Sequence, residues 1–468
     1  MTNELAKLER RAMNYLDEHR AELMSEYFDL VRIPSVSADP EHAADVARCA
    51  ELIAARLQRI GLDDVRVDPT EGHPVVSART PLISGAPTYL VYAHYDVQPA
   101  DPLEEWNTPP FTPTQVGDEL RGRGISDDKA HVHLHLAAIE ALLVASRLGV
   151  NIRVIFEGEE EISSRHLETW LRTQSDLGSL AGCIVSDTTF LTSDVPSLGT
   201  GVRGLLYTQI DVETAAHDLH SGGYGGAVPN AAEALATILA QLKRADGQVA
   251  IPDFYADVID DRAFRDLIPT LPFDEAEWLR GAAPSQGQAT GETNFSLLER
   301  LWLRPTLDIN GMWSGHTGEG PKTVIPARAH ARVSCRLVAD QHPERVFAGL
   351  SRLVAECAPP WAKVTVTLVS ASLPARADTT GPLAEAALAA LAHGFGREPI
   401  LQREGGSIPV VGILTSYLPG TPLILLGFSP PDDAAHAPNE CMRMWNLDGG
   451  LRTLVRMWLV LSLEEKNR

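Results

Sequence analysis

Apolar residues recur at helical spacing in two stretches at the start of the chain. The first covers residues 5–30. The second covers residues 43–60 and stops at Gly61, a residue type that commonly follows a helix. The sequence VRIPSVSADP between them is rich in turn-forming residues. The pattern therefore predicts amphipathic helices joined by a short connector.

Short, continuous apolar runs come next, and such runs are typical of buried strands. They cover residues 88–97, 151–156 and 182–185, while residues 130–148 have a helical pattern. Strands that alternate with helices indicate parallel strands joined by crossover helices. We therefore expect an α/β fold, with a mostly parallel, doubly wound sheet and helices on both faces.

The middle of the chain has a different character. Strand-like segments at residues 205–212, 331–337 and 363–369 alternate with helical segments at residues 230–242 and from Glu344 onward. This order predicts an inserted α+β domain of about 170 residues, which is a common domain size.

After the insertion, helical residues 383–393, a strand-like run at residues 423–428 and a C-terminal helix resume the first pattern. Residues 1–203 and 379–468 are therefore expected to form one domain in two segments. Residues 204–378 are expected to form the insertion.

The composition excludes several classes of protein. The 468 residues are 44% hydrophobic and 22% charged, as in ordinary globular proteins. A formal net charge of -22, from 62 acidic and 40 basic residues, opposes binding to nucleic acid or to an anionic membrane. Five scattered cysteines without a CxxC pair argue against a disulfide framework. With no signal peptide and no apolar run of membrane-spanning length, we expect a cytoplasmic protein.

Polar residues that could bind a cation follow the apolar strands or precede a helix. They are His94 and Asp96 in AHYDV, Asp127 in GRGISDDK, Glu159 and Glu160 in FEGEEE, Asp187 in CIVSDT, and His436 in DDAAHAPNE. In open α/β sheets, ligands bind outside the carboxyl ends of the strands. Each motif alone has an ordinary structural explanation, such as a helix cap or a solvated acidic run. Five such sites in one sheet indicate a bound cation.

The residue types narrow the choice of cation. His94 and Asp96 point to the same side of a strand, so Asp96 can accept a hydrogen bond from one imidazole nitrogen and leave the other free for a metal. Two histidines with several carboxylates suit zinc, manganese or cobalt better than calcium, which prefers oxygen ligands. Two metals about 3.5–4 Å apart, bridged by a carboxylate, are a common use of such a set.

The ordered motifs AHYDVQP, GRGISDDK, EGEEEISS, SDT and AHAPNE resemble those of a known enzyme family. This is the binuclear metallopeptidase and deacylase family of carnosinase-like dipeptidases, acetylornithine deacetylase and glutamate carboxypeptidases. The resemblance covers nearly the whole chain, and HDLHSGGYGGAVPN, KTVIPARAHARVSCRLV and REGGSIPV are most similar to the dipeptidase branch. It implies a catalytic domain, an inserted lid and dimerisation domain, and two divalent metal ions, zinc first among them.

Carried over to this sequence, the resemblance implies a role for each motif residue. Asp127 would bridge the metals, with His94 and Asp187 completing one site and Glu160 and His436 the other. The peptide bond after Asp127 would be cis.

Two further motif residues would act without binding metal directly. Asp96 would orient His94, and Glu159 would be the general base that takes a proton from water.

The inserted domain would supply the remaining groups. His220 is similar to a family histidine that stabilises the tetrahedral oxyanion, often from the other subunit of a homodimer. Arg336 and Thr323 resemble lid residues that hold the substrate's carboxylate, and Ser407 could add a donor to that group.

His131 and His135, in the helical segment before the insertion, could share a helix face as zinc ligands, but the usual glutamate is absent and packing is the favoured interpretation.

The sequence therefore predicts a metal-dependent dipeptidase that acts on small molecules. The alternatives on the same scaffold are an N-acyl amino acid deacylase, a carboxypeptidase and an inactive metal-binding relative. A glycosidase with paired carboxylates is a further alternative, and its activity would survive chelation of metals.

Overall fold

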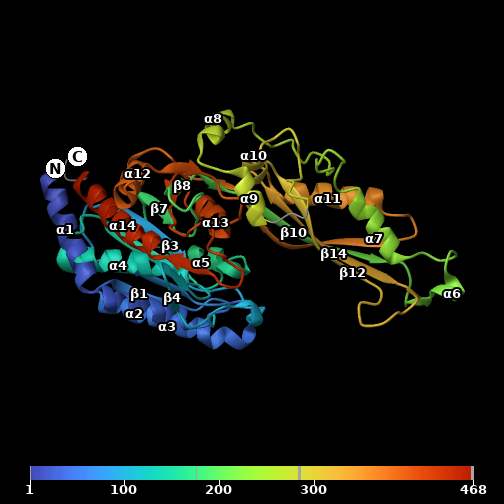
Figure 1. Cartoon of the computed structure of the whole chain (residues 1–468), viewed down its shortest axis with the longest axis horizontal. Coiled ribbons are helices and arrows are strands. Elements are labelled where there is room, and N and C mark those ends of the chain that lie inside the picture. The colour runs from blue at the N-terminus through green and yellow to red at the C-terminus, as the bar shows by residue number, and fades with distance from the viewer. Residues whose placement is uncertain (1, 175–176, 283–285, 465–468) are drawn as a thin grey trace. The chain divides into compact units, whose positions relative to one another are not determined.

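The computed structural model describes residues 2–174, 177–282 and 286–464, and the chain forms two compact units (Figure 1). Unit 1 consists of Met1–Gly201, Arg376–Arg403 and Pro409–Arg468. Unit 2 consists of Val202–Ala375 and Glu404–Ile408. The sequence pattern does not indicate that the short segment Glu404–Ile408 belongs to unit 2.

Unit 1 is built on one large sheet in the described part of the chain. Its strands, in spatial order, are β1 (Asp63–Asp68), β2 (Val75–Arg79), β6 (Asn151–Glu157), β3 (Thr88–His94), β7 (Gly182–Val185), β18 (Leu423–Leu425), β8 (Ser197–Gly199) and β17 (Ile400–Gln402). The central strands β6, β3, β7 and β18 are parallel to one another, and β8 is parallel to β17. At the other edge, β1 pairs antiparallel with β2, and β2 pairs antiparallel with β6.

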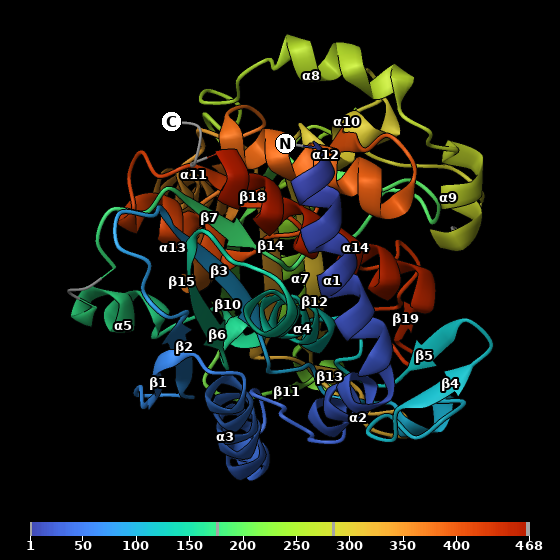
Figure 2. The same cartoon turned by 90° about the vertical axis from the view of Figure 1, so that its left-hand side faces the viewer.

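Helices cover both faces of this sheet (Figure 2). One group shares a single apolar core and consists of α1 (Thr2–Glu18), α2 (Arg20–Val31), α3 (Ala43–Arg59), α4 (Lys129–Ala145), α12 (Pro382–Phe395) and α14 (Met444–Glu464). On the other side lie α5 (Leu167–Thr173) and α13 (Pro409–Tyr417). The predicted α/β class, with a mainly parallel sheet, is confirmed. The single helical run predicted for residues 5–30 is divided at His19.

A small sheet in unit 1 joins two loops that are distant in sequence. It contains β4 (Thr114–Val116), β5 (Glu119–Arg121) and β19 (Cys441–Arg443). Because Cys441 pairs with Arg121, the loop before β19 lies against the loop after β5, and the Gly122 N–H donates to the Glu440 carbonyl oxygen.

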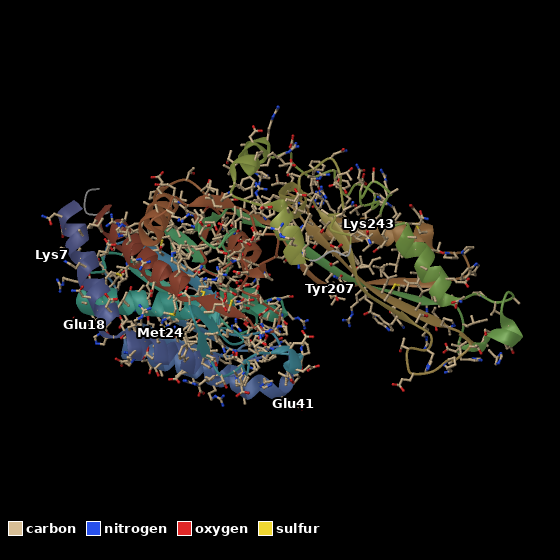
Figure 3. All side chains as sticks on the ribbon, viewed as in Figure 1. Lys7, Glu18, Met24, Glu41, Tyr207 and Lys243 are labelled. Carbon is tan, nitrogen blue, oxygen red and sulfur yellow. The ribbon has the colours of Figure 1, made fainter. Side chains whose placement is uncertain are left out.

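Unit 2 contains an antiparallel sheet with the order β12 (Thr306–Ser314), β14 (Arg328–Leu337), β10 (Gly204–Glu213) and β15 (Lys363–Ser372). Helices α7 (Ala231–Ala240) and α11 (Pro343–Cys357) pack against it. Buried residues alternate along β10 with half-buried ones such as Tyr207 (Figure 3). The short strands β11 (Leu219–His220) and β13 (Val324–Ile325) pair with each other, and α6 (Ser221–Tyr224) follows β11.

The shorter helices of unit 2 are α8 (Arg262–Leu267), α9 (Glu275–Ala282) and α10 (Leu297–Trp302). Of the helices in the described residues, none combines the length and apolar character needed to cross a membrane. All five cysteines are free thiols.

Candidate metal centre and active site

The carboxyl ends of three neighbouring parallel strands bring the first polar residues together. His94 is the last residue of β3 and pairs with Glu157, the last residue of β6. Tyr92 pairs with Val185, so Asp187 follows the end of β7 close to His94. The strand ends therefore converge as the sequence predicted.

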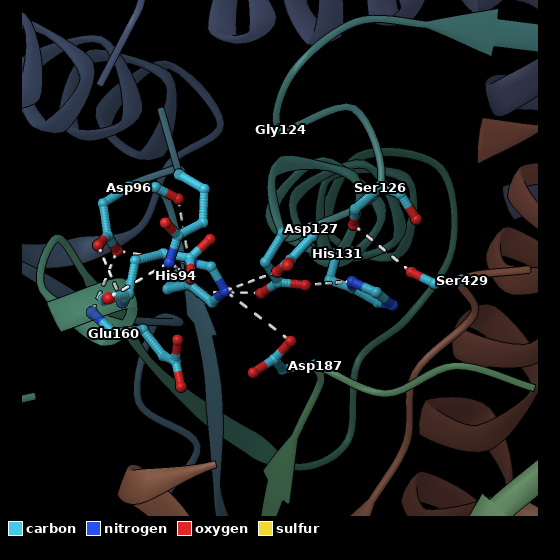
Figure 4. Close-up of polar contacts among 12 residues, drawn as sticks. His94, Asp96, Gly124, Ser126, Asp127, His131, Glu160, Asp187 and Ser429 are labelled. Atoms are coloured by element: carbon cyan, nitrogen blue, oxygen red, sulfur yellow. Dashed lines mark hydrogen bonds and ion pairs between the residues drawn. The ribbon is translucent and has the colours of Figure 1, made fainter. Parts of the chain in front are cut away.

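His94, Asp127 and Asp187 form a first group of candidate metal ligands in unit 1. His94 Nε2 lies 3.1 Å from Asp127 Oδ1 and 3.8 Å from Asp187 Oδ1 (Figure 4). Asp127 comes from the loop before α4, while the other two residues come from adjacent strand ends.

A second group shares Asp127 and adds Glu161 and His436. His436 Nε2 lies 3.0 Å from Asp127 Oδ2 and 3.1 Å from Glu161 Oε2. Asp127 thus offers one oxygen to each histidine, the arrangement expected of a carboxylate between two metals.

Asp96 fixes both His94 and the loop that carries the glutamates. His94 Nδ1 lies 3.1 Å from the Asp96 carbonyl oxygen and 3.4 Å from its Oδ1, which leaves Nε2 directed at the ligand group. The Asp96 carboxylate also accepts hydrogen bonds from the backbone N–H groups of Glu160 (3.2 Å) and Glu161 (3.1 Å). Asp96 therefore links a histidine of the first group to the loop of the second.

The structure corrects the interpretation of the glutamate run by one residue. From the sequence, Glu160 is the expected ligand beside His436, but among the described residues Glu161 is the glutamate in that group. The regular alternation of β6 ends at Glu157, and a 3₁₀ turn, η3 (Glu160–Ile162), follows Glu159. Strand periodicity therefore could not show which of the three side chains faces His436.

Glu159, the expected general base, has other partners. Its carboxylate lies 2.9 Å from His166 Nδ1 and accepts a hydrogen bond from the His73 N–H at 3.1 Å. A side chain at Gly72 would collide with Glu159, so the loop passes directly over this carboxylate. Glu159 is thus engaged in joining two loops rather than in the ligand cluster. Glu160 lies next to His94 and Asp187 but belongs to neither ligand group (Figure 4).

Glu440 holds the loop that presents Asp127. Its buried carboxylate accepts hydrogen bonds from the N–H groups of Gly124, Ser126 and Asp127 at 2.8–3.0 Å, and from Arg123 Nη1 at 2.7 Å. The peptide bond between Asp127 and Asp128 is cis, as the family resemblance implied. Glu440 is the last residue of the AHAPNE motif, and the motif alone does not indicate this role.

A second network of hydrogen bonds connects the backbone of His94 to His131 through Asp128. The Phe428 N–H donates to His131 Nε2 at 2.8 Å, so Nδ1 carries the hydrogen and donates it to Asp128 Oδ1. Asp128 Oδ2 accepts the His94 backbone N–H at 2.9 Å. His131 is therefore a hydrogen-bonded core residue, and His135 Nε2 contacts Ser186 Oγ. The packing interpretation of these histidines is favoured over a zinc site.

The electrostatics of the cluster suit cations. Burial raises the pKa of Asp187 to about 6, although His94 opposes this shift. Burial and the charge of Asp187 raise the pKa of Glu160 well above its usual range. Hydrogen bonds to Asp127 and Glu161 raise the pKa of His436 to about 11. Buried carboxylates this close together repel one another, and divalent cations would relieve that repulsion. The nitrogen and oxygen donors of both groups fit zinc, manganese or cobalt.

In unit 2, two of the predicted substrate-binding residues are in contact. Arg336 Nη1 donates to Ser407 Oγ at 2.7 Å. His220 and Thr323 form another pair, because His220 lies opposite Val324 and the Ser221 N–H donates to the Thr323 carbonyl oxygen.

These two pairs are far apart within one chain. Arg336 lies near the end of β14, whereas β13 precedes the start of that strand at Arg328. At about 3.3 Å per residue, the intervening strand spans roughly 26 Å. Thr323 and Arg336 of one chain are therefore too far apart to hold one carboxylate group together.

Comparison with known proteins gives a consistent result. The model of a family described as Peptidase family M20/M25/M40 matches residues 90–460. The chain is 31% identical to the Cys-Gly metallodipeptidase dug1 of Schizosaccharomyces pombe, over 93% of this chain and 95% of that protein. It is 28% identical to the Beta-Ala-His dipeptidase of Rattus norvegicus, over 97% and 95%. The solved structure of the dipeptidase Dug1p from Saccharomyces cerevisiae superposes with a TM-score of 0.86 at 26% identity, and covers 99% of both chains.

Proposed function

Because the chain belongs to Peptidase family M20/M25/M40, we propose that it is a metal-dependent dipeptidase that hydrolyses the peptide bond of dipeptides. The observation that carries this proposal is the pair of ligand groups that share Asp127, with Glu160 adjacent but outside both. The choice of dipeptides is supported by the relatives named above, which match nearly the whole chain and are dipeptidases.

The metal ligands are proposed to be His94, Asp127 and Asp187 in one site and Asp127, Glu161 and His436 in the other, with zinc as the preferred metal. Two cations bound there would lower the pKa of water and polarise the scissile carbonyl group.

Glu160 is proposed as the general base, in place of Glu159. It would take a proton from the attacking water and give it to the leaving amine. Its backbone N–H is held by Asp96, which keeps its side chain beside the ligand cluster without a ligand role.

His220 is proposed to stabilise the oxyanion. Its Nδ1 accepts a hydrogen bond from the Gly222 N–H at 3.0 Å, so Nε2 carries the hydrogen and can donate it to developing negative charge. Arg336 and Ser407 would bind the carboxylate at the C-terminus of the substrate, for which a guanidinium is well suited.

The active form is proposed to be a homodimer in which His220 and Thr323 serve the active site of the partner subunit. The long separation of these residues from Arg336 along β14 supports this arrangement. Five free cysteines are in keeping with a reducing compartment, and we propose a cytoplasmic location.

The proposal is tested by stripping the purified protein with a chelator, restoring zinc, manganese or cobalt, and assaying three substrate classes. These are dipeptides, acetylated amino acids and longer peptides. Metal-dependent cleavage of dipeptides is expected. Cleavage of acetylated amino acids alone would contradict the dipeptidase assignment, and activity that survives chelation would contradict the metal mechanism.

A further inference from the structure

Arg203 and Arg336 place two guanidinium groups at one end of the sheet in unit 2. Arg203 immediately precedes β10, and Arg336 pairs with Leu205 near the start of that strand. Burial lowers the pKa of Arg203 to about 10, and the positive charge of Arg336 contributes to this shift. The two side chains are therefore close enough for their charges to interact.

Neither arginine has a carboxylate partner in the described part of the chain. Burial lowers the pKa of Arg336, and the acid whose charge opposes the shift for both arginines is Asp308. Asp308 itself lies 3.4 Å from Lys243 Nζ. Arg203 is only 9% exposed, and its Nη1 is buried without a hydrogen-bond partner among the described residues. Buried positive charge without a counterion is costly, and a bound anion would reduce that cost.

Arg203 also holds the short segment that carries Ser407. Its Nε donates to the Gly405 carbonyl oxygen at 2.6 Å, and its backbone N–H donates to the Gly406 carbonyl oxygen at 3.0 Å. Ser407 Oγ in turn accepts a hydrogen bond from Arg336 Nη1. These contacts explain why Glu404–Ile408 belongs to unit 2 although the chain on either side belongs to unit 1.

From these contacts we infer that Arg203 is a positioning and specificity-determining residue for substrates with a free C-terminal carboxylate. It fixes Gly405 and Gly406 so that Ser407 and Arg336 face the carboxylate together, and it adds a second positive charge to that site. The inference rests on the proposed function, which assigns Arg336 and Ser407 to the substrate carboxylate.

The test compares a dipeptide with its C-terminal amide, using Arg203→Gln and Arg203→Lys. Arg203→Gln removes the charge and the Nε bond but keeps the backbone bond to Gly406. For the dipeptide, KM is expected to rise roughly 10-fold, the effect of losing one charge-assisted hydrogen bond. The inhibition constant of the amide as a competitor is expected to stay within about twofold, because the amide lacks the charge that the site recognises. Arg203→Lys is expected to lie between the wild type and Arg203→Gln.

Two controls separate positioning from general damage to the fold. Arg304→Gln removes an arginine of unit 2 whose guanidinium is paired with Glu292, and it should leave the dipeptide KM unchanged. Arg203→Gln in a Ser407→Ala background should raise KM by less than it does in the wild type, because the positioning part of the effect acts through Ser407.

Equal loss of dipeptide and amide binding in Arg203→Gln would overturn the inference, as would full additivity with Ser407→Ala. Failure of the wild-type enzyme to cleave any dipeptide would instead overturn the proposed function.

Discussion

At the scale of single residues, three consecutive glutamates have three different surroundings. Glu159 is bound to His166 and the His73 N–H, Glu160 lies beside Asp187, and Glu161 lies beside His436. All three side chains carry the same carboxylate group, so the direction in which each side chain points decides its role.

The glutamate assignments predict different effects of two similar substitutions. Glu160→Gln should retain both metals but lower kcat by about 10²–10⁴, because it removes the general base. Glu159→Gln should keep most of the activity, since glutamine can still accept the His73 N–H. Steady-state kinetics with metal analysis checks both. A loss in Glu159→Gln as large as that in Glu160→Gln would restore Glu159 as the base.

The ligand assignment predicts a change in metal content. Glu161→Ala should reduce the bound metal from two ions per chain towards one, because it removes a ligand from only one group. Elemental analysis of the purified variant measures this, with Glu159→Gln as the matched control that keeps both metals. An unchanged content in Glu161→Ala would remove Glu161 from the ligand set.

At the scale of elements, the site depends on parallel strand ends and on two loops held by buried carboxylates. The strands and their polar ends could be predicted from the sequence, because continuous apolar runs end abruptly in His94 and Asp187. The side-chain directions after β6 could not, because they depend on the 3₁₀ turn at Glu160. Strand β12 was also missed, since many of its residues are exposed and it shows no regular apolar alternation.

The loop that presents Asp127 is predicted to depend on Glu440. Glu440→Ala would leave Arg123 and three backbone N–H groups without their buried acceptor, at a cost of about 3–5 kcal/mol in the free energy of unfolding. Denaturant unfolding of the metal-free protein measures this cost. Asp448→Asn removes an exposed ion pair with Arg20 and should change the stability by less than about 1 kcal/mol. Equal stabilities of the two variants would contradict the role of Glu440.

At the scale of the whole molecule, the chain is divided between a unit with the metal centre and a unit with the proposed substrate-binding groups. The change in sequence pattern near residues 203 and 378 lies close to the points where the chain passes between the two units. It could not predict that Glu404–Ile408 belongs to unit 2, because that assignment depends on contacts with Arg203 and Arg336 rather than on local pattern.

The proposed use of His220 across a dimer is testable by complementation. Glu160→Gln and His220→Ala should each be nearly inactive alone. Co-expressed in equal amounts, they should recover about a quarter of the wild-type activity, because half of the dimers are mixed and each mixed dimer has one intact site. No recovery, with mixed dimers shown to be present, would place His220 in the active site of its own subunit.

The central claim is that two metal ions share Asp127, and anomalous diffraction at the metal absorption edge tests it most directly. Two peaks per chain are expected within about 2.0–2.3 Å of ligand atoms, one beside His94 and Asp187 and the other beside Glu161 and His436, both contacting Asp127. A single peak, or two peaks of which one does not contact Asp127, would contradict the claim.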